Sequence, residues 1–252
     1  MIDTKHARKN LLLSALPDAD WQRILPQLEV ESLALGQSIY ESGRPIKKLY
    51  FPTTCVISLL HVMNDGASAE IAVAGREGVV GVSLFMGGVS TTSRAIVQSA
   101  GEAFLLRDSV VTEEFAQGGA LHHLLLRYTQ ALLTQMAQTA VCNRHHTVDQ
   151  QLCRWLLLSI DRLDTNELTM TQQLIADMLG VRREGVTEAA GKLQQIGSIE
   201  YRRGRITVRD RGIIEQLACE CYEVVKKEYD RLLGPLTTAT ITQFPKQQTH
   251  KS

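Results

Sequence analysis

The chain lacks two features that would place it in or beyond a membrane. No apolar run among its 252 residues approaches the roughly 18 residues that a membrane-spanning helix needs. Its N-terminus carries Asp3, Lys5, Arg8 and Lys9 where a secretory signal peptide would have an apolar stretch. These two absences predict a cytoplasmic protein with no membrane partner.

The sequence also lacks a disulfide framework and a recognisable catalytic pattern. Its cysteines are odd in number, and reduced thiols are expected for Cys55, Cys142, Cys153, Cys219 and Cys221. The neighbouring histidines at 122–123 and 145–146 point about 100° apart on a helix, and the pair Cys219 and Cys221 favours core packing, so no metal or other cofactor is predicted. No Ser/His/Asp, paired-carboxylate or P-loop pattern is found, which argues against an enzyme.

The chain has no formal net charge at pH 7, because 27 Lys and Arg residues balance 27 Asp and Glu residues. The balance is not uniform, since basic residues outnumber acidic ones between Arg182 and Arg211. This local excess favours an anionic partner for that segment.

The basic segment overlaps a pattern typical of a helix-turn-helix unit. The stretch Leu168–Gly197 accommodates two short amphipathic helices, with Thr169 and Gln172 suited to a capping box at the start of the first. Ala176 provides the small residue of the helix contact, Gly180 the turn, and Val186 the branched residue opposite. This spacing predicts two helices that cross at a steep angle.

Polar residues collect where the second helix leaves its packed face, as expected for a helix that reads DNA. The candidates for base and phosphate contacts are Arg182, Arg183, Glu184, Thr187, Glu188 and Lys192. The following segment, Glu200–Val208, alternates apolar and basic residues about Gly204 and predicts a β-hairpin wing with Arg202, Arg203 and Arg205 on the DNA backbone. An ordinary helical hairpin with a solvated charged face is the alternative.

The N-terminal half reads as an antiparallel barrel or roll after a helical segment from Asn10 to about Leu28. Short β-prone runs are separated by turns rich in glycine. They are Leu49–Phe51, Val56–Val62, Ile71–Val73, Val79–Val82, Arg94–Val97 and Ala103–Leu106.

A long helix from about Leu121 to Arg144 should follow the roll. Steps of four and three residues indicate a coiled-coil seam between two copies of the chain, formed by Leu121, Leu125, Tyr128, Leu132, Gln135, Thr139 and Cys142. The segment Asp210–Leu233 predicts an added C-terminal helix that either supports the helix-turn-helix or contacts the roll, and a loose tail follows.

From about Leu11 to Val208, the order of roll, long helix and winged helix-turn-helix resembles the bacterial Crp/Fnr family of transcription regulators. The opening Gly-x-x-Ile-x-x-x-Gly at Gly36–Gly43 and the pair Arg183-Glu184 carry the resemblance. It implies an α+β fold with a cyclic-nucleotide-binding-like β-roll, a dimerisation helix and a C-terminal DNA-binding domain. The expected divisions are 1–118, 119–147, 148–236 and a flexible tail at 237–252. Thr187 stands where members often carry Ser, and Glu188 where many carry Arg.

The resemblance weakens at the sensor. Family members that bind cyclic AMP hold the ribose with a Glu and the cyclic phosphate with an Arg, whereas the matching stretch here contains Gly81, Val82, Ser83, Ser93 and Arg94. Valine cannot accept the ribose hydrogen bond, so cyclic AMP is not the expected effector. An iron–sulfur sensor with N-terminal cysteines does not fit either, because the first cysteine is Cys55.

The sequence therefore predicts a homodimeric regulator that binds double-stranded DNA at a near-palindromic operator, with RNA polymerase as a further partner. Its effector is not identified by the sequence. The rival interpretation is a roll that binds a signal and controls a partner protein rather than DNA.

Overall fold

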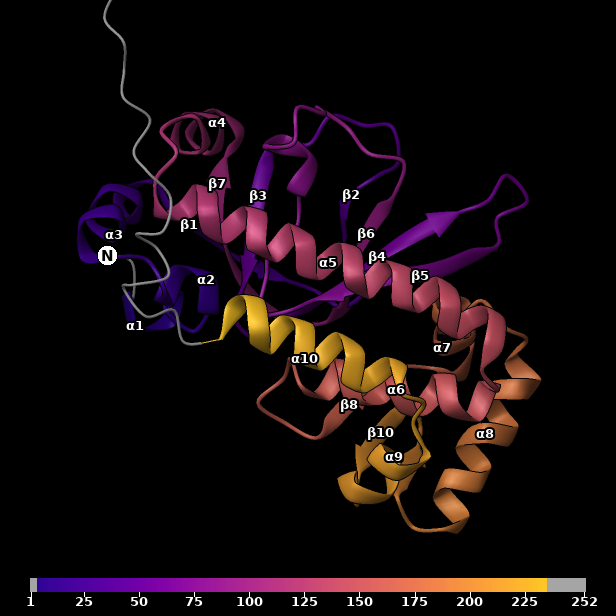
Figure 1. Cartoon of the computed structure of the whole chain (residues 1–252). Coiled ribbons are helices and arrows are strands. Elements are labelled where there is room, and N and C mark those ends of the chain that lie inside the picture. Colours follow the sequence, from indigo (N-terminus) through magenta and orange to yellow (C-terminus); the bar gives the residue numbers. More distant parts are fainter. Residues whose placement is uncertain (1–3, 235–252) are drawn as a thin grey trace, which may run out of the picture.

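The computed structural model describes residues 4–234, so the predicted tail at 237–252 lies outside the described residues. The chain folds into an N-terminal roll, a long helix that runs along it, and a C-terminal helical domain with a small sheet (Figure 1). Among the described helices, none is both long and apolar enough to cross a membrane.

The predicted N-terminal helix is divided into short pieces. They are α1 (Thr4–Ala7), α2 (Leu11–Ser14), α3 (Asp18–Ile24) and the 3-10 helix η1 (Leu25–Gln27). Asn10 is fully buried and caps α2, since its Oδ1 accepts from the backbone N–H of Leu12 and Leu13. Its Nδ2 donates to the carbonyl oxygens of Pro52 and Gly78, each at 2.9 Å, which fixes these helices to the roll.

The roll is built from two antiparallel sheets, as the sequence indicates. One has the order β1-β7-β3 and the other β2-β6-β4-β5. The strands are β1 (Glu29–Leu33), β2 (Ser38–Tyr40), β3 (Lys48–Pro52), β4 (Val56–Val62), β5 (Ser68–Ala74), β6 (Arg94–Ser99) and β7 (Gly101–Arg107).

The predicted strand at Val79–Val82 is wrong. Only Val80 pairs with a strand, through an isolated bridge to Tyr50. Gly81 has φ +113°, a conformation outside the β region, and the chain turns there into the 3-10 helix η2 (Val82–Leu84). The run is apolar because Val79 and Val80 are buried in the core, which is the feature that made it look like a strand.

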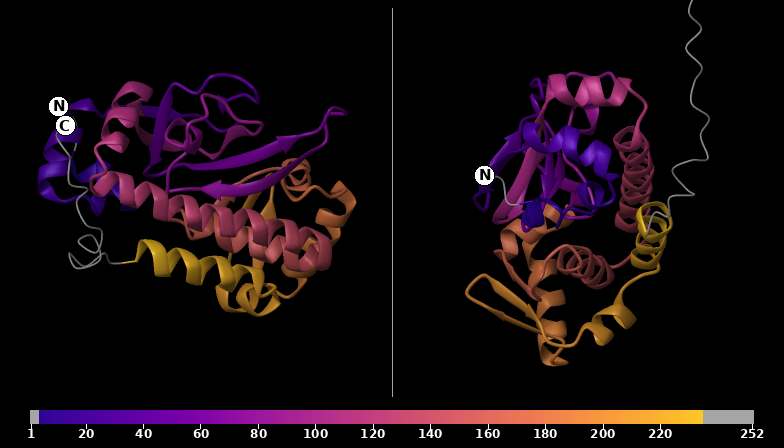
Figure 2. Two further views of the ribbon diagram at one scale, coloured as in Figure 1. Left: turned by 45° about the horizontal axis from the view of Figure 1, so that its top comes forward. Right: turned by 90° about the vertical axis from the view of Figure 1, so that its left-hand side faces the viewer.

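Two helices connect the roll to the C-terminal domain, α4 (Asp108–Ala116) and α5 (Ala120–His145). The C-terminal helix α10 (Cys221–Leu233) packs along α5 of the same chain, and both views in Figure 2 place the two side by side. Within one chain, α10 thus packs mainly on the long helix and less on α6, whereas the sequence left open contact with the helix-turn-helix or with the roll. The predicted helix 210–233 is in fact two helices, α9 (Arg211–Leu217) and α10, with Asp210 capping α9.

The C-terminal domain surrounds the helix α6 (Val148–Ile160), of which every residue from Gln151 to Ile160 is buried. Around it lie β8 (Glu167–Thr169), α7 (Gln172–Leu179), α8 (Arg183–Gln195), β9 (Ile199–Arg202), β10 (Arg205–Val208) and α9. The roll packs on α6 through buried polar contacts. The Gln98 side chain bridges the two, accepting from Ser58 Oγ and donating to Ser159 Oγ, both at 2.8 Å.

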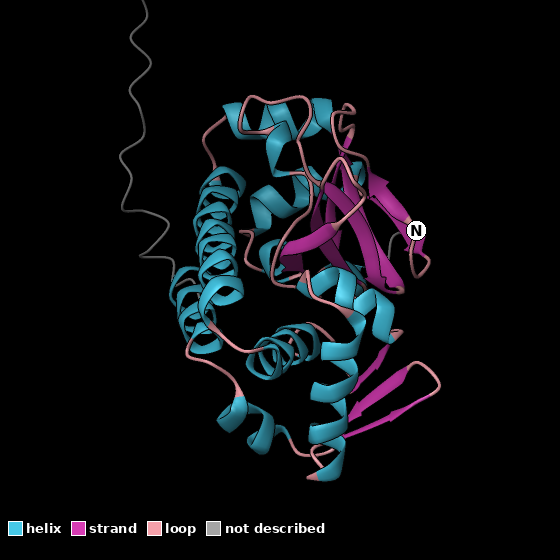
Figure 3. Ribbon diagram, turned by 90° about the vertical axis from the view of Figure 1, so that its right-hand side faces the viewer, coloured by secondary structure: helices cyan, strands magenta, loops and turns pink. Residues whose placement is uncertain are grey.

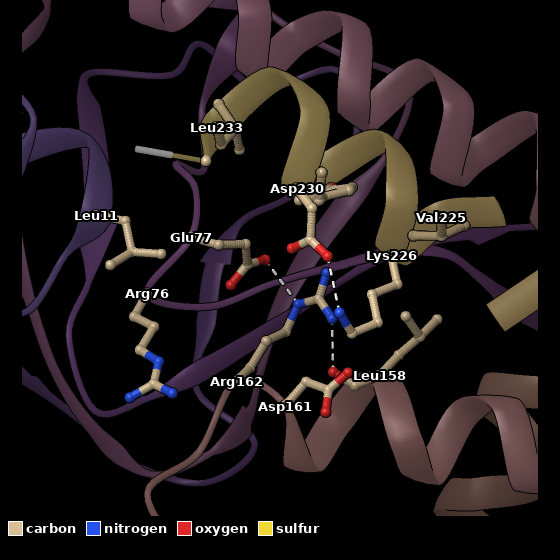
Figure 4. A pocket seen from close by; sticks show the side chains of 12 residues that line it. Leu11, Arg76, Glu77, Leu158, Asp161, Arg162, Val225, Lys226, Asp230 and Leu233 are labelled. Carbon is tan, nitrogen blue, oxygen red and sulfur yellow. Dashed lines mark hydrogen bonds and ion pairs between the residues drawn. The ribbon is translucent and has the colours of Figure 1, made fainter. Parts of the chain in front are cut away.

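A cavity of about 320 Å³ lies where the roll, α6 and α10 meet (Figure 4). Four of its charged groups form two ion pairs with one another. Arg162 Nε lies 2.7 Å from Glu77 Oε1, and Lys226 Nζ lies 2.7 Å from Asp230 Oδ2. The buried Arg162 also lies over the Tyr229 ring. Its ion pair with Glu77 therefore joins the C-terminal domain to the roll, and its ring contact joins it to α10.

Candidate nucleic-acid interface

The helix-turn-helix consists of α7 and α8, and its turn forms as the sequence predicts. Gly180 ends α7 in the left-handed conformation, with φ +66° and ψ +34°. A side chain there would also crowd the roll, since an added Cβ would lie 3.2 Å from the Ala69 Cβ in β5. Glycine is therefore required both by the turn and by the contact with the roll.

The start of α7 differs from the prediction. Thr171, not Thr169, is the N-cap, and its Oγ1 accepts from the Leu174 backbone N–H at 3.2 Å. Thr169 is instead the last residue of β8, where it pairs with Arg205. The predicted capping box is thus wrong, because an unpredicted strand occupies its first position.

The predicted contact between the two helices is present. Ala176 on α7 and Val186 on α8 are both fully buried. The other buried residues of α8 are Ala189, Ala190 and Leu193, so one face of the helix is covered by the protein. The opposite face is exposed.

That opposite face carries the polar residues expected to contact DNA. Arg182 is the N-cap residue of α8, and Arg183, Glu184, Thr187 and Glu188 are exposed on its first two turns. Thr187 Oγ1 lies 2.8 Å from Gln172 Oε1 and 3.0 Å from the Arg183 carbonyl oxygen, so this hydroxyl links α8 to α7.

The wing is the hairpin of β9 and β10. Its tight turn has Arg203 at φ +50° and Gly204 at φ +75°, the left-handed pair that suits a two-residue hairpin loop. Strand β8, which the sequence analysis missed, pairs with β10 and widens the wing to three strands in the order β8-β10-β9. The hairpin projects from the body beside α8 (Figure 3).

A groove of about 480 Å³ lies between α8 and the wing. Its lining is mainly polar and basic, from the start of α7, from α8 and from the hairpin: Thr171, Gln172, Gln173, Arg183, Tyr201, Arg203 and Gly204. Two arginines from different elements therefore face one open groove.

The predicted cations differ in whether the chain already neutralises them. Lys192 Nζ lies 2.9 Å from Asp149 Oδ2 and 3.0 Å from Glu188 Oε1. Arg202 lies 3.2 Å from Glu200, and Arg205 lies 3.8 Å from Glu167. Within residues 4–234, no acidic side chain forms an ion pair with Arg182, Arg183 or Arg203, which leaves these three for an external anion.

Comparison with known proteins matches this region to one family. Residues 150–217 match the model of the Crp-like helix-turn-helix domain, a span that contains most of α6, the helix-turn-helix, the wing and α9. This domain is therefore of the Crp-like helix-turn-helix type.

One curated relative and two solved structures extend the likeness beyond the matched domain. The chain is 22% identical over 191 residues to a global nitrogen regulator from Synechococcus elongatus, covering 72% of this chain and 86% of the relative. A putative Crp/Fnr transcriptional regulator from Eubacterium rectale has a TM-score of 0.64 at 17% identity, covering 82% of this chain and 96% of that one. FixK2 from Bradyrhizobium japonicum has a TM-score of 0.65 at 20% identity, covering 76% and 98%.

The predicted effector residues of the roll contact side chains of their own chain. Arg94, the candidate phosphate ligand, lies 3.0 Å from Glu41 Oε2. Ser93 is buried with its Oγ 3.1 Å from Thr91 Oγ1. Gly81 and Val82 lie at the start of η2, and Ser83 Oγ is buried without a hydrogen-bond partner among the described residues.

The long helix requires a correction of the predicted dimer seam. Within the single chain the seam residues are already buried, at 0–6% exposure: Leu121, Leu125, Tyr128, Leu132, Gln135, Thr139 and Cys142. The Gln135 side chain, for example, donates to the Val73 carbonyl oxygen and to Tyr229 Oη. The repeat indicated a packed face correctly, but that face packs on the roll and on α10 rather than on a second copy.

The exposed face of α5 carries its own repeat. Steps of four and three residues connect the exposed positions Leu126, Gln130, Leu133, Ala137, Ala140 and Arg144. Leu126 is 45% exposed and Leu133 57% exposed, and their spacing of seven residues places both on this face.

The sequence analysis also missed a cluster of sulfur and nitrogen ligands. Side-chain atoms of Cys142, His146, Cys219 and Cys221 all lie within 4.8 Å of one another. The prediction that Cys219 and Cys221 serve packing alone considered only neighbours in sequence, whereas Cys142 and Cys219 are 77 positions apart. One clue was available, because Cys142 and His146 are one helical turn apart and share a face.

Proposed function

We propose that this chain is a sequence-specific DNA-binding transcription regulator that acts as a homodimer. The observation that carries the proposal is the groove between α8 and the wing, where Arg183 and Arg203 face open space without an acidic partner. Arginine in such a position suits phosphate and the guanine edge, because its planar fork donates two parallel hydrogen bonds.

The roles within the interface follow from position and pairing. Arg183 reads guanine O6 and N7 from the first turn of α8, and Glu184 accepts from a cytosine amino group. Arg182 and Arg203 hold phosphates. Lys192, Arg202 and Arg205 contribute less than the sequence suggested, since each already pairs with a carboxylate of the chain.

Dimerisation is assigned to the exposed face of α5 that begins at Leu126 and ends at Arg144. An apolar stripe with a coiled-coil repeat is covered efficiently by a second copy of itself around a two-fold axis. Two recognition helices related by that axis would meet half-sites about one helical turn, or a multiple of it, apart, which is the basis for expecting a near-palindromic operator.

The roll is proposed to sense an effector other than cyclic AMP. A cyclic phosphate would have to displace Glu41 from Arg94, and Val82 offers no acceptor for a ribose hydroxyl. RNA polymerase is proposed as a further partner because the chain is similar to regulators of the Crp/Fnr family. The rival function, control of a partner protein, would leave Arg183 and Arg203 of the groove without an anionic ligand.

The salt dependence of DNA binding tests the main proposal. The logarithm of the association constant for fragments from the chain's own promoter region should fall linearly with the logarithm of the salt concentration. The slope should be about −0.9 for each phosphate contacted. Fluorescence anisotropy over a range of ionic strengths measures this slope. Weak binding that does not change with salt would exclude the DNA function and favour the protein partner.

The subunit contact is tested by Leu133→Glu. The change places a charge on the exposed stripe and should give a folded monomer, because Leu133 contributes little to the core of its own chain. Val30→Glu, at a side chain 54% exposed on β1, is the matched control and should leave the dimer intact. Leu132→Glu should instead unfold the chain, since Leu132 is buried within it. Analytical ultracentrifugation that found a dimeric Leu133→Glu variant would place the contact elsewhere.

A further inference from the structure

The cysteine–histidine cluster lies where the long helix ends and the C-terminal domain begins. Cys142 and His146 project from the last turns of α5, and Cys219 and Cys221 lie at the junction of α9 and α10. The three cysteines are buried and form a cluster separate from the main hydrophobic core. Their function is therefore not accounted for by packing in that core.

We propose that Cys142, His146, Cys219 and Cys221 bind one Zn²⁺ ion in a tetrahedral site. Cys142 Sγ and Cys219 Sγ are 3.5 Å apart, and Cys221 Sγ and His146 Nδ1 are also 3.5 Å apart. With Zn–S near 2.3 Å and Zn–N near 2.0 Å, tetrahedral geometry places two sulfurs about 3.8 Å apart and a sulfur and a nitrogen about 3.5 Å apart. The side chains thus need only small movements to enclose an ion.

The close spacing favours one ion over an iron–sulfur cluster. A cluster binds thiolates on different iron atoms and holds them farther apart than thiolates on a single ion. Here all four ligand atoms lie within 4.8 Å of one another. Three sulfurs and one imidazole are the ligand set of many structural zinc sites, and carboxylate-preferring ions such as Mg²⁺ and Ca²⁺ do not suit it.

The groups around the cluster suit a metal site as well. His146 Nε2 lies 3.3 Å from Glu220 Oε2, the carboxylate–histidine contact that orients a metal-binding imidazole and leaves Nδ1 for the ion. Gln138 Nε2 donates to Cys221 Sγ at 3.1 Å. The buried Arg154 acts electrostatically on Cys142, and its positive charge would balance the single negative charge of three thiolates around Zn²⁺.

Binding would tie the end of α5 to the α9–α10 junction. Each of the three thiols would release its proton to solvent as its sulfur bonds to the ion, with no change of oxidation state. The site goes beyond the proposed function, because it would form whether or not the chain binds DNA.

Metal binding by the reduced, metal-free full chain tests the proposal. One Zn²⁺ per chain should bind, and Cys219→Ala and Cys142→Ala should each weaken binding by more than about 100-fold. Cys55→Ala is the matched control, since Cys55 is an equally buried thiol in the roll, and it should bind like the wild type. Equal affinity in Cys219→Ala and wild type would overturn the assignment.

The wild-type chain provides a second test that does not depend on the folding of a variant. Co²⁺ in place of Zn²⁺ should give the intense visible bands of a tetrahedral site together with thiolate-to-metal charge transfer. Zn²⁺ should also raise the midpoint of thermal unfolding in proportion to the logarithm of its concentration. A weak octahedral Co²⁺ spectrum without charge transfer, or a Cys142–Cys219 disulfide that forms while Zn²⁺ stays free, would refute the site.

Discussion

The C-terminal half places arginines in two opposite surroundings. Arg154 and Arg162 are 4% and 5% exposed at the junction with the roll, and Arg162 pairs with Glu77. Arg182, Arg183 and Arg203 are exposed near the recognition groove and form no ion pair with residues of the described chain. A buried arginine whose charge is compensated by a carboxylate of the chain thus joins two domains. The exposed arginines have no such carboxylate and are proposed to bind an external anion.

The largest effect in this comparison is expected from Arg162→Ala. Removing one partner of a buried pair leaves Glu77 without compensation and should lower the free energy of unfolding by about 3–5 kcal/mol. Arg76→Ala is the matched control, because its ion pair with Asp164 is largely exposed and should contribute about 0–1 kcal/mol. Urea denaturation measures both variants, and equal losses would contradict the buried role of Arg162.

Glu70 makes the same junction sensitive to pH. Burial raises the pKa of Glu70 to about 7, although Ser58 and the charges of Arg154 and Arg162 oppose the shift. Because the folded chain binds this proton more tightly than the unfolded chain, the stabilisation is complete below about pH 4.5 and is lost as the pH rises through about 7.

Glu70→Gln should remove this dependence. At about 1.4 kcal/mol per pKa unit, the wild type should lose about 3 kcal/mol relative to the variant between pH 4.5 and pH 8. Urea denaturation at several pH values measures the difference. Parallel pH profiles for the two proteins would show that Glu70 titrates normally in the folded chain.

The sequence predicted local features of the recognition surface better than contacts between distant segments. The spacing of Ala176, Gly180 and Val186 is a property of one short stretch, so the helix-turn-helix could be found without the fold. The seam on α5 was assigned to the wrong face, because a repeat shows which side chains are covered but not what covers them. Here α10 covers part of that face, and α10 lies almost a hundred residues away, as the contact between Gln135 and Tyr229 illustrates.

The cysteine cluster was missed for the same physical reason. Its two halves come together only when α9 and α10 fold back on the end of α5. The predicted effector residues were also incomplete. The sequence indicates that Arg94 lies near a ligand loop, but it does not reveal that Glu41 pairs with Arg94.

Within the exposed set, Arg183→Ala should have the larger effect on recognition. It should reduce operator affinity by about 1–3 kcal/mol and relax the preference at one base pair in each half-site. Lys192→Ala is the control on the same helix, and its preferred motif should not change, because Asp149 and Glu188 already hold the ammonium. Binding-site selection with both variants measures the motif, and an unchanged motif for Arg183→Ala would remove this residue from base reading.

The smallest effect is expected when a wing arginine without an ion pair, Arg203, is compared with one that has an ion pair, Arg202. Arg203→Gln should weaken binding to all DNA sequences alike and reduce the salt slope by about 0.9, the value for one phosphate contact. Arg202→Gln should change the slope less, because Glu200 lies 3.2 Å from Arg202 and already offsets its charge. Both side chains are exposed on the same hairpin, so the unfolding midpoint should stay unchanged in both variants. Anisotropy titrations at several salt concentrations compare the two, and equal slopes would mean that pairing within the chain does not decide which arginines meet the DNA backbone.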